Sequence, residues 1–150
     1  MPLVTTTFNQ KTLIRIAMVI AFVQFTNALE YMMFSPVFKF MAADFAVPVT
    51  FSGYVSGMYT SGAVLSGIIA FYWIDRCNKK HFLIANMVLL AMATLLTTFT
   101  TSFPLLLTLR FFAGLVGGTT MAVGITILIN HTPADLRGKM LATVIASFSM

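Results

Sequence analysis

The sequence predicts an all-α membrane protein with four complete transmembrane helices and a truncated fifth. Only 9% of its 150 residues are charged and 59% are hydrophobic, whereas soluble domains carry about 25% charged residues. Four apolar segments are each long enough to cross a bilayer core, which takes about 20 helical residues. Most of the charges fall in the short segments between them. We expect helices at approximately 13–38, 51–74, 82–101 and 105–130, and an incomplete one at 140–150.

The first segment follows a polar, threonine-rich stretch, residues 1–12, which we expect to be a flexible tail. Gln24, Asn27 and Glu30 interrupt its apolar run, and the run is too long for the core of a cleaved signal peptide. A membrane helix that carries an ionisable residue therefore explains this segment better.

The second segment contains a ladder of small residues that includes Gly53 and Gly57. Such ladders are typical of close helix packing in membranes, so these two glycines are predicted packing positions. The third and fourth segments are apolar spans joined by a short turn. The fifth has only eleven residues before the sequence stops, too few to cross a bilayer. We therefore expect the chain to be a piece of a longer protein or the product of a truncated gene.

Lysine and arginine counts predict the orientation, because cytoplasmic loops carry an excess of both. Seven of the nine positive residues are Lys11 and Arg15 near the N-terminus and those in the segments 75–81 and 131–139. The segment 39–50 has only Lys39, and 102–104 has none. We therefore expect a multi-pass protein of a bacterial inner (plasma) membrane with its N-terminus in the cytoplasm.

A polar stripe runs along the first segment. At 100° per residue, Gln24, Asn27, Glu30 and Tyr31 fall within an arc of about 120°, and large apolar side chains occupy the opposite side. This face could serve only to form hydrogen bonds between helices. Ionisable residues inside a membrane are costly and usually functional, so we favour a functional face.

The fourth segment carries a complementary pattern on one face, with Arg110, Gly114 and Gly118 in register and Gly117 beside them. The glycines permit close helix approach. Arg110 lies roughly 10 Å inside the segment at 1.5 Å per residue, so its side chain could also reach the outer surface. Glu30 and Arg110 lie about 6 Å and 8 Å from their helix centres toward the same side. They could pair if the two helices are neighbours.

The remaining chemistry-bearing residues narrow the functional class. Cys77 is the one cysteine, which excludes an internal disulfide and a cysteine-built metal site. His81 and His131 fall in predicted cytoplasmic loops, and no metal-binding cluster, nucleophile elbow or phosphate loop supports an enzyme. We expect no metal and no cofactor. We also expect no nucleic-acid partner, because the positive residues behind the net charge of +5 lie mostly in short loops between apolar segments, where they indicate the orientation in the membrane.

Four motifs follow one another along the chain. They are residues 31–36 (YMMFSP) with 44–47 (DFAV), residues 75–80 (DRCNKK), the pattern Arg110-x-x-x-Gly114-x-x-Gly117-Gly118, and residues 132–139 (TPADLRGK). In this order and spacing they resemble the N-terminal half of a major facilitator superfamily transporter, most closely its drug:proton antiporter and sugar-efflux branch. The first is similar to the end of the first helix and the outer loop, and the second to the signature cytoplasmic loop between helices two and three. The third resembles the fourth-helix motif, and the fourth resembles the loop before helix five.

Two positions depart from the family pattern of the loop at 75–80. Phe71 stands four residues before Asp75, where the family usually has glycine, and Asn78 replaces a second glycine. Asparagine tolerates a left-handed backbone, so the second change is mild. Phe71 is bulky where close helix contact is expected.

The resemblance implies twelve helices in two six-helix halves, with a substrate site between the halves and alternating access. It places helices one and four together at the central cavity. It also associates an acidic residue in helix one and the arginine of helix four with proton coupling, here Glu30 and Arg110. Asp75, Arg76, Lys79 and Lys80 are the matching residues of the cytoplasmic gating loop.

The leading functional prediction is therefore a fragment of a secondary transporter that couples protons to the efflux of a drug, sugar or metabolite. Its predicted partners are a small-molecule substrate, protons, the lipid bilayer and the missing C-terminal half. The alternative is a small four-helix membrane subunit or assembly protein without transport activity of its own.

Overall fold

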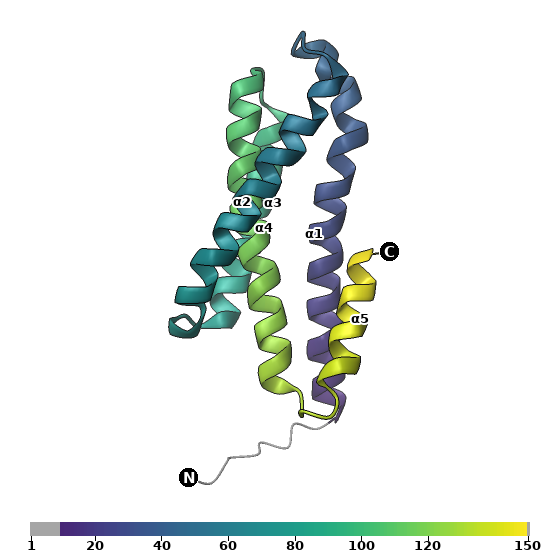
Figure 1. The fold of residues 1–150 in the computed structure, drawn as a ribbon, viewed down its shortest axis with the longest axis vertical. Coiled ribbons are helices and arrows are strands. Elements are labelled where there is room, and N and C mark those ends of the chain that lie inside the picture. Colours follow the sequence, from purple (N-terminus) through teal and green to yellow (C-terminus); the bar gives the residue numbers. More distant parts are fainter. Residues whose placement is uncertain (1–9, 150) are drawn as a thin grey trace.

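The computed structural model describes the backbone of residues 10–149 and the side chains of residues 10–146. Within this range the chain forms five α-helices and two short 3₁₀ turns (Figure 1), and the predicted all-helical class is confirmed. The elements in order are α1 (Gln10–Asp44), η1 (Val49–Phe51), α2 (Ser52–Trp73), η2 (Ile74–Arg76), α3 (Lys79–Thr98), α4 (Phe103–His131) and α5 (Arg137–Ser149). Residues 1–9 of the expected tail and Met150 lie outside the described residues, and residues 10–12 belong to α1.

Helix α1 extends beyond both ends expected for the first segment, and it contains Pro36. Its last turns continue because Phe38 and Ala42 are buried against Val55 of α2 and Leu106 of α4. The helix then ends in a Schellman motif. Ala46 adopts a φ of 53°, the amide of Val47 donates to the carbonyl of Ala42 at 3.1 Å, and that of Ala46 donates to Ala43 at 3.2 Å. This cap satisfies carbonyls at the end of the helix.

Helix α4 lies at the centre of the bundle. Helix α2 crosses it and packs on it most extensively, α3 packs beside it, and α1 contacts it from the other side (Figure 1). Helix α5 packs mainly on α1. The adjacency of helices one and four that the resemblance implied is therefore present.

Besides the cluster around Phe38, two more buried clusters connect these helices. The first lies toward the opposite end of the bundle, and the second lies at mid-height. Ala17, Ile20, Leu128 and Val144 join α1, α4 and α5. Tyr59, Leu90 and Ala113 join α2, α3 and α4. Lateral contacts between whole helices thus replace the single globular core of a soluble domain.

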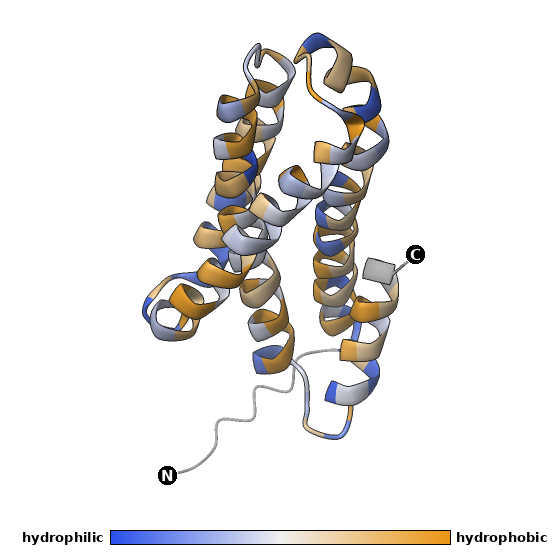
Figure 2. Cartoon of the chain, turned by 45° about the horizontal axis from the view of Figure 1, so that its top comes forward, coloured by the Kyte–Doolittle hydropathy of each residue, from blue (hydrophilic) through white to orange (hydrophobic). Residues whose placement is uncertain are grey.

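Within the part of the chain that the structure describes, four helical spans are long and apolar enough to cross a membrane, namely α1, the stretch Val49–Arg76, α3 and α4. In the most apolar stretch of α1 and of α4, 39% of residues are buried, against 22% for Val49–Arg76 and 17% for α3. Figure 2 shows apolar residues over most of the long helices and hydrophilic residues near the turns. The outward apolar side chains suit lipid contact, and α1 and α4 form the protected interior.

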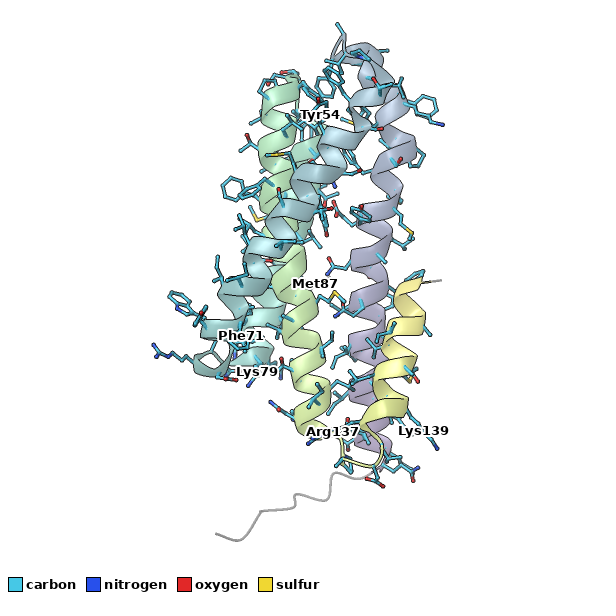
Figure 3. The ribbon with its side chains drawn as sticks, in the orientation of Figure 1. Tyr54, Phe71, Lys79, Met87, Arg137 and Lys139 are labelled. Carbon is cyan, nitrogen blue, oxygen red and sulfur yellow. The ribbon has the colours of Figure 1, made fainter. Side chains whose placement is uncertain are left out.

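The basic segments gather at one end of the bundle. The start of α1, the α2–α3 connection and the α4–α5 connection lie toward the lower end of the bundle in Figure 1, and the α1–α2 and α3–α4 turns lie at the upper end. Figure 3 shows Lys79, Arg137 and Lys139 at the first end and Tyr54 near the second. The predicted orientation requires the basic segments to lie on one side of the membrane, and this arrangement meets that requirement.

Thiol labelling in sealed membrane vesicles can test that orientation. Cys77 should react with a membrane-impermeant maleimide only from the cytoplasmic side, because it lies at the basic end. In a Cys77→Ser background, Lys39→Cys should react only from the opposite side, since Lys39 lies on the exposed last part of α1. The reverse labelling pattern would contradict the orientation that the charge counts predict.

Candidate functional site

Arg110 and Glu30 form an ion pair across the α1–α4 contact. Nη1 of Arg110 donates to Oε1 of Glu30 at 2.8 Å, and the two side chains are only 4% and 9% exposed. The alternative in which Arg110 reaches the outer surface is therefore wrong for this structure, because its partner holds it inside.

Phe34 completes the surroundings of the arginine. The guanidinium carbon of Arg110 lies 3.6 Å from the centroid of the Phe34 ring, an arrangement typical of a cation–π contact. The sequence analysis did not single out Phe34. Its position one helical turn after Glu30 was the available signal, because residues i and i+4 of a helix share a face.

Two more residues of the polar stripe, Asn27 and Gln24, also face α4. Nδ2 of Asn27 donates to the carbonyl of Gly117 at 3.2 Å, and Nε2 of Gln24 donates to that of Met121 at 3.3 Å. Both side chains are buried. Large apolar residues on the opposite side of α1, such as Phe22, are exposed. The stripe is thus a continuous polar contact between α1 and α4.

Several buried polar atoms in this contact have no hydrogen-bond partner among the described residues. They are Oε1 of Gln24, Oδ1 of Asn27, Oε2 of Glu30 and Nε of Arg110. Unpartnered polar atoms are costly inside a protein, and they usually bind water or a ligand. All four lie on the stripe or in the ion pair, so the α1–α4 contact can form further hydrogen bonds with water or a ligand.

Tyr31 lies at the edge of the stripe, half-exposed, with its ring 5.1 Å from that of Tyr59 on α2. Tyr59 is a second residue that the sequence analysis missed. It is buried, its hydroxyl lies over Gly117, and its backbone lies against Gly114. Tyr59 is one of three tyrosines in this apolar span, and nothing in the sequence distinguished it for these contacts.

The glycines of α4 lie where α2 approaches most closely. A Cβ atom at Gly114 would overlap the backbone carbonyl of Tyr59, and one at Gly118 would lie 2.6 Å from the carbonyl oxygen of Ala63. Gly62 of α2 makes the reciprocal approach, with the amide nitrogen of Leu115 3.0 Å from its Cβ position. These glycines therefore set the distance between the two helices.

Gly53 and Gly57, which were predicted as packing positions, have no close contact with another helix among the described residues. A Cβ atom at either position would have open space within 4 Å, and both residues are exposed. The buried row of α2 instead runs through Val55, Tyr59 and Gly62. Nine residues at 100° each place Gly53 on the opposite side of the helix from Gly62.

The predicted gating residues lie at the basic end, away from the ion pair. Asp75 and Arg76 form the exposed turn η2, and Lys79 and Lys80 begin α3. None of the four has an ion pair among the described residues. Phe71 is 80% exposed and contacts Tyr72 edge-on, so the bulk at this position does not press on a neighbouring helix of this chain.

Two cavities border the polar contact from different sides. One of ≈ 380 Å³ lies between α1, α3 and α4, and its wall includes Glu30, Arg110 and Thr97. The other, of ≈ 170 Å³, lies between α1, α2 and α4, and its wall includes Asn27 and Tyr59. The α1–α4 contact thus separates two spaces large enough for water or a small molecule.

Comparison with known protein families shows which family the chain belongs to. Residues 20–150 match the model of the family described as Major Facilitator Superfamily. The chain belongs to the major facilitator superfamily. It is therefore a transporter-family membrane protein, as the motifs predicted.

Two curated relatives of this superfamily chain are transporters. It is 32% identical over 89 residues, or 59% of its length, to the 4-hydroxybenzoate transporter PcaK of Pseudomonas aeruginosa. It is 25% identical over 101 residues, or 67% of its length, to the niacin transporter NiaP of Acinetobacter baylyi. The matched regions are 19% and 23% of those relatives, so the chain spans only about a fifth of their length. No solved structure matches it at a significant level.

Proposed function

We propose that this superfamily chain is part of a proton-coupled secondary transporter in which Glu30 carries the proton and Arg110 is its charge partner. The observation that supports this role is the ion pair of 2.8 Å buried between α1 and α4. Charges are seldom retained inside a membrane without a function. A purely structural contact would not need a titratable group at this place.

The proposed coupling follows from a difference in the charge that Glu30 favours when it is paired with Arg110 and when it is separated from it. While Arg110 is 2.8 Å away, it stabilises the charged carboxylate of Glu30. When α1 and α4 shift, Glu30 becomes a buried carboxylate without a partner, and proton uptake then removes the unfavourable charge. Return of the guanidinium would expel the proton. Alternating access by the two halves of a transporter supplies such a shift.

The names of the relatives support a substrate class. Both 4-hydroxybenzoate and niacin are small aromatic carboxylic acids, and we propose a substrate of this kind in place of a drug or sugar. Tyr31, Tyr59 and Asn27 border the cavity of ≈ 170 Å³, where aromatic rings and an amide could contact it. The rest of the site would come from the missing C-terminal half, with Asp75, Arg76, Lys79 and Lys80 as the cytoplasmic gate.

Transport assays on vesicles from cells that express the complete gene product test this proposal. We expect pH-gradient-driven flux of radiolabelled 4-hydroxybenzoate or niacin at least tenfold above that of vesicles without the protein, with nearly complete loss after addition of a protonophore. Nicotinamide, which has the shape of niacin without its negative charge, should not be carried. Flux of either acid that ignores the pH gradient would contradict proton coupling.

The direction of transport can be separated in the same assay. The predicted efflux corresponds to accumulation in inverted vesicles with an acidic interior, because protons leaving such vesicles would drive the substrate inward. Accumulation in right-side-out vesicles would instead show uptake with protons. That result would contradict the efflux branch and leave the role of Glu30 intact.

A further inference from the structure

A third cavity lies at the basic end of the bundle, far along α1 from the ion pair. It has a volume of ≈ 580 Å³ and lies between the first turns of α1 and α3 and the last turns of α4. It shares no lining residue with the cavities beside Glu30 and Asn27. Its role is therefore a separate question from the binding of substrate or proton beside Glu30 and Asn27, and two of its lining residues, Lys79 and Lys80, also belong to the proposed cytoplasmic gate.

The rim of this cavity is positively charged. Arg15 of α1 and Lys79 and Lys80 of α3 line it, and the ring of His131 at the end of α4 lies beside them. None of the four acidic residues of the chain is in its wall. Three fixed positive charges without an opposing carboxylate attract an anion.

The inner wall of the cavity is apolar. Ile16 and Val19 of α1, Leu83 of α3 and Ile127 of α4 form it, on the membrane side of the basic rim. Val19 is 59% exposed. A soluble anion would satisfy the rim and leave this wall in contact with water, at a cost that scales with the apolar area. The cavity therefore fits a molecule with an anionic end and an apolar end.

We propose that this cavity binds an anionic phospholipid from the leaflet on the side predicted to be cytoplasmic. Its phosphate group would lie at Arg15, Lys79 and Lys80, and the first part of an acyl chain would lie along Val19 and Leu83. Basic pockets between transmembrane helices on the cytoplasmic side are typical sites for anionic head groups. A second copy of the chain fits less well, because it carries the same net charge of +5 and the same basic rim.

Accessibility of a thiol inside the cavity measures its occupancy. In a Cys77→Ser background, Val19→Cys places a small reporter on the apolar wall, and its reaction with uncharged N-ethylmaleimide is followed in a neutral detergent. Added phosphatidylglycerol should slow this reaction at least fivefold. Phosphatidylcholine with the same acyl chains should slow it less than twofold, and glycerol phosphate without acyl chains should have no effect.

A matched pair of variants separates site binding from general charge attraction. Lys79→Gln with Lys80→Gln should raise the phosphatidylglycerol concentration needed for half protection by about tenfold or more. Arg76→Gln with Lys139→Gln removes two positive charges from the same end, outside the cavity wall, and should leave that concentration unchanged. Circular dichroism of each variant controls for folding.

Four results would overturn the proposal. Equal protection by phosphatidylcholine would mean that any acyl chain fills the cavity, and protection by glycerol phosphate alone would indicate a site for soluble anions. Protection that rises with protein concentration in the absence of lipid would indicate a second copy as the occupant. Equal losses in both double variants would also contradict a defined head-group site.

Discussion

Replacing Arg110 with alanine should lower the free energy of unfolding by about 3–5 kcal/mol. The substitution leaves the carboxylate of Glu30, 9% exposed, charged and unpaired between α1 and α4. It also removes the contact of the guanidinium with Phe34 at 3.6 Å. Equilibrium unfolding in mixed micelles, followed by circular dichroism, measures the difference. Arg110→Lys should fall between the wild type and Arg110→Ala, because lysine keeps the charge and loses the planar geometry.

The double variant tests whether this loss comes from the pair. Glu30→Gln removes the charge and keeps the shape of the side chain. Combined with Arg110→Ala, it should recover part of the lost stability, because no uncompensated carboxylate then remains inside. A coupling energy of about 1–3 kcal/mol in the double-mutant cycle is expected for residues in direct contact. Strict additivity of the two single effects would contradict a pair.

Gly114→Ala should destabilise the α2–α4 contact by about 3 kcal/mol. A Cβ atom at this position would overlap the backbone carbonyl of Tyr59. Backbone atoms cannot move aside as a flexible side chain can, so α2 must shift away from α4. The shift would also disturb the cavity of ≈ 170 Å³, which Tyr59 borders. Thermal or denaturant unfolding in detergent gives the loss.

Gly57→Ala is the matched control for that substitution. Gly57 lies in the same helix–helix unit, in α2, with open space around its Cβ position. Because alanine favours a helix more than glycine does, the control should be neutral or more stable by up to about 1 kcal/mol. Equal destabilisation by the two substitutions would mean that Gly114 does not set the distance between α2 and α4.

The class of fold and the two charged residues could be predicted from the sequence for physical reasons. A bilayer requires long apolar helices, and a buried charge stands out in such a segment. The depth argument placed Glu30 and Arg110 at similar heights. Adjacency of their helices could not be derived from the residues, because spacing along one helix says nothing about its neighbours. The resemblance supplied it.

Other features depended on tertiary contacts that the pattern does not encode. A ladder of small residues indicates close packing and does not say which face is used; among the described residues the close approach falls at Gly62, whereas Gly53 and Gly57 have open space around their Cβ positions. The continuation of α1 past Phe38 depends on the burial of Phe38 and Ala42 against α2 and α4. Phe34 and Tyr59 were missed because aromatic residues are frequent in membrane helices, and only the structure shows which of them contact the site.

The proposed role of Glu30 is tested most directly by comparing two kinds of flux in the Glu30→Gln variant of the complete gene product. We expect pH-gradient-driven transport to fall to the level of empty vesicles, because glutamine cannot carry a proton. Exchange of labelled for unlabelled substrate, which needs no net proton movement, should continue at a rate within about threefold of the wild type, because the shape of the site is kept. If Glu30→Gln retained pH-gradient-driven accumulation, the proton would be carried elsewhere and the central claim would be wrong.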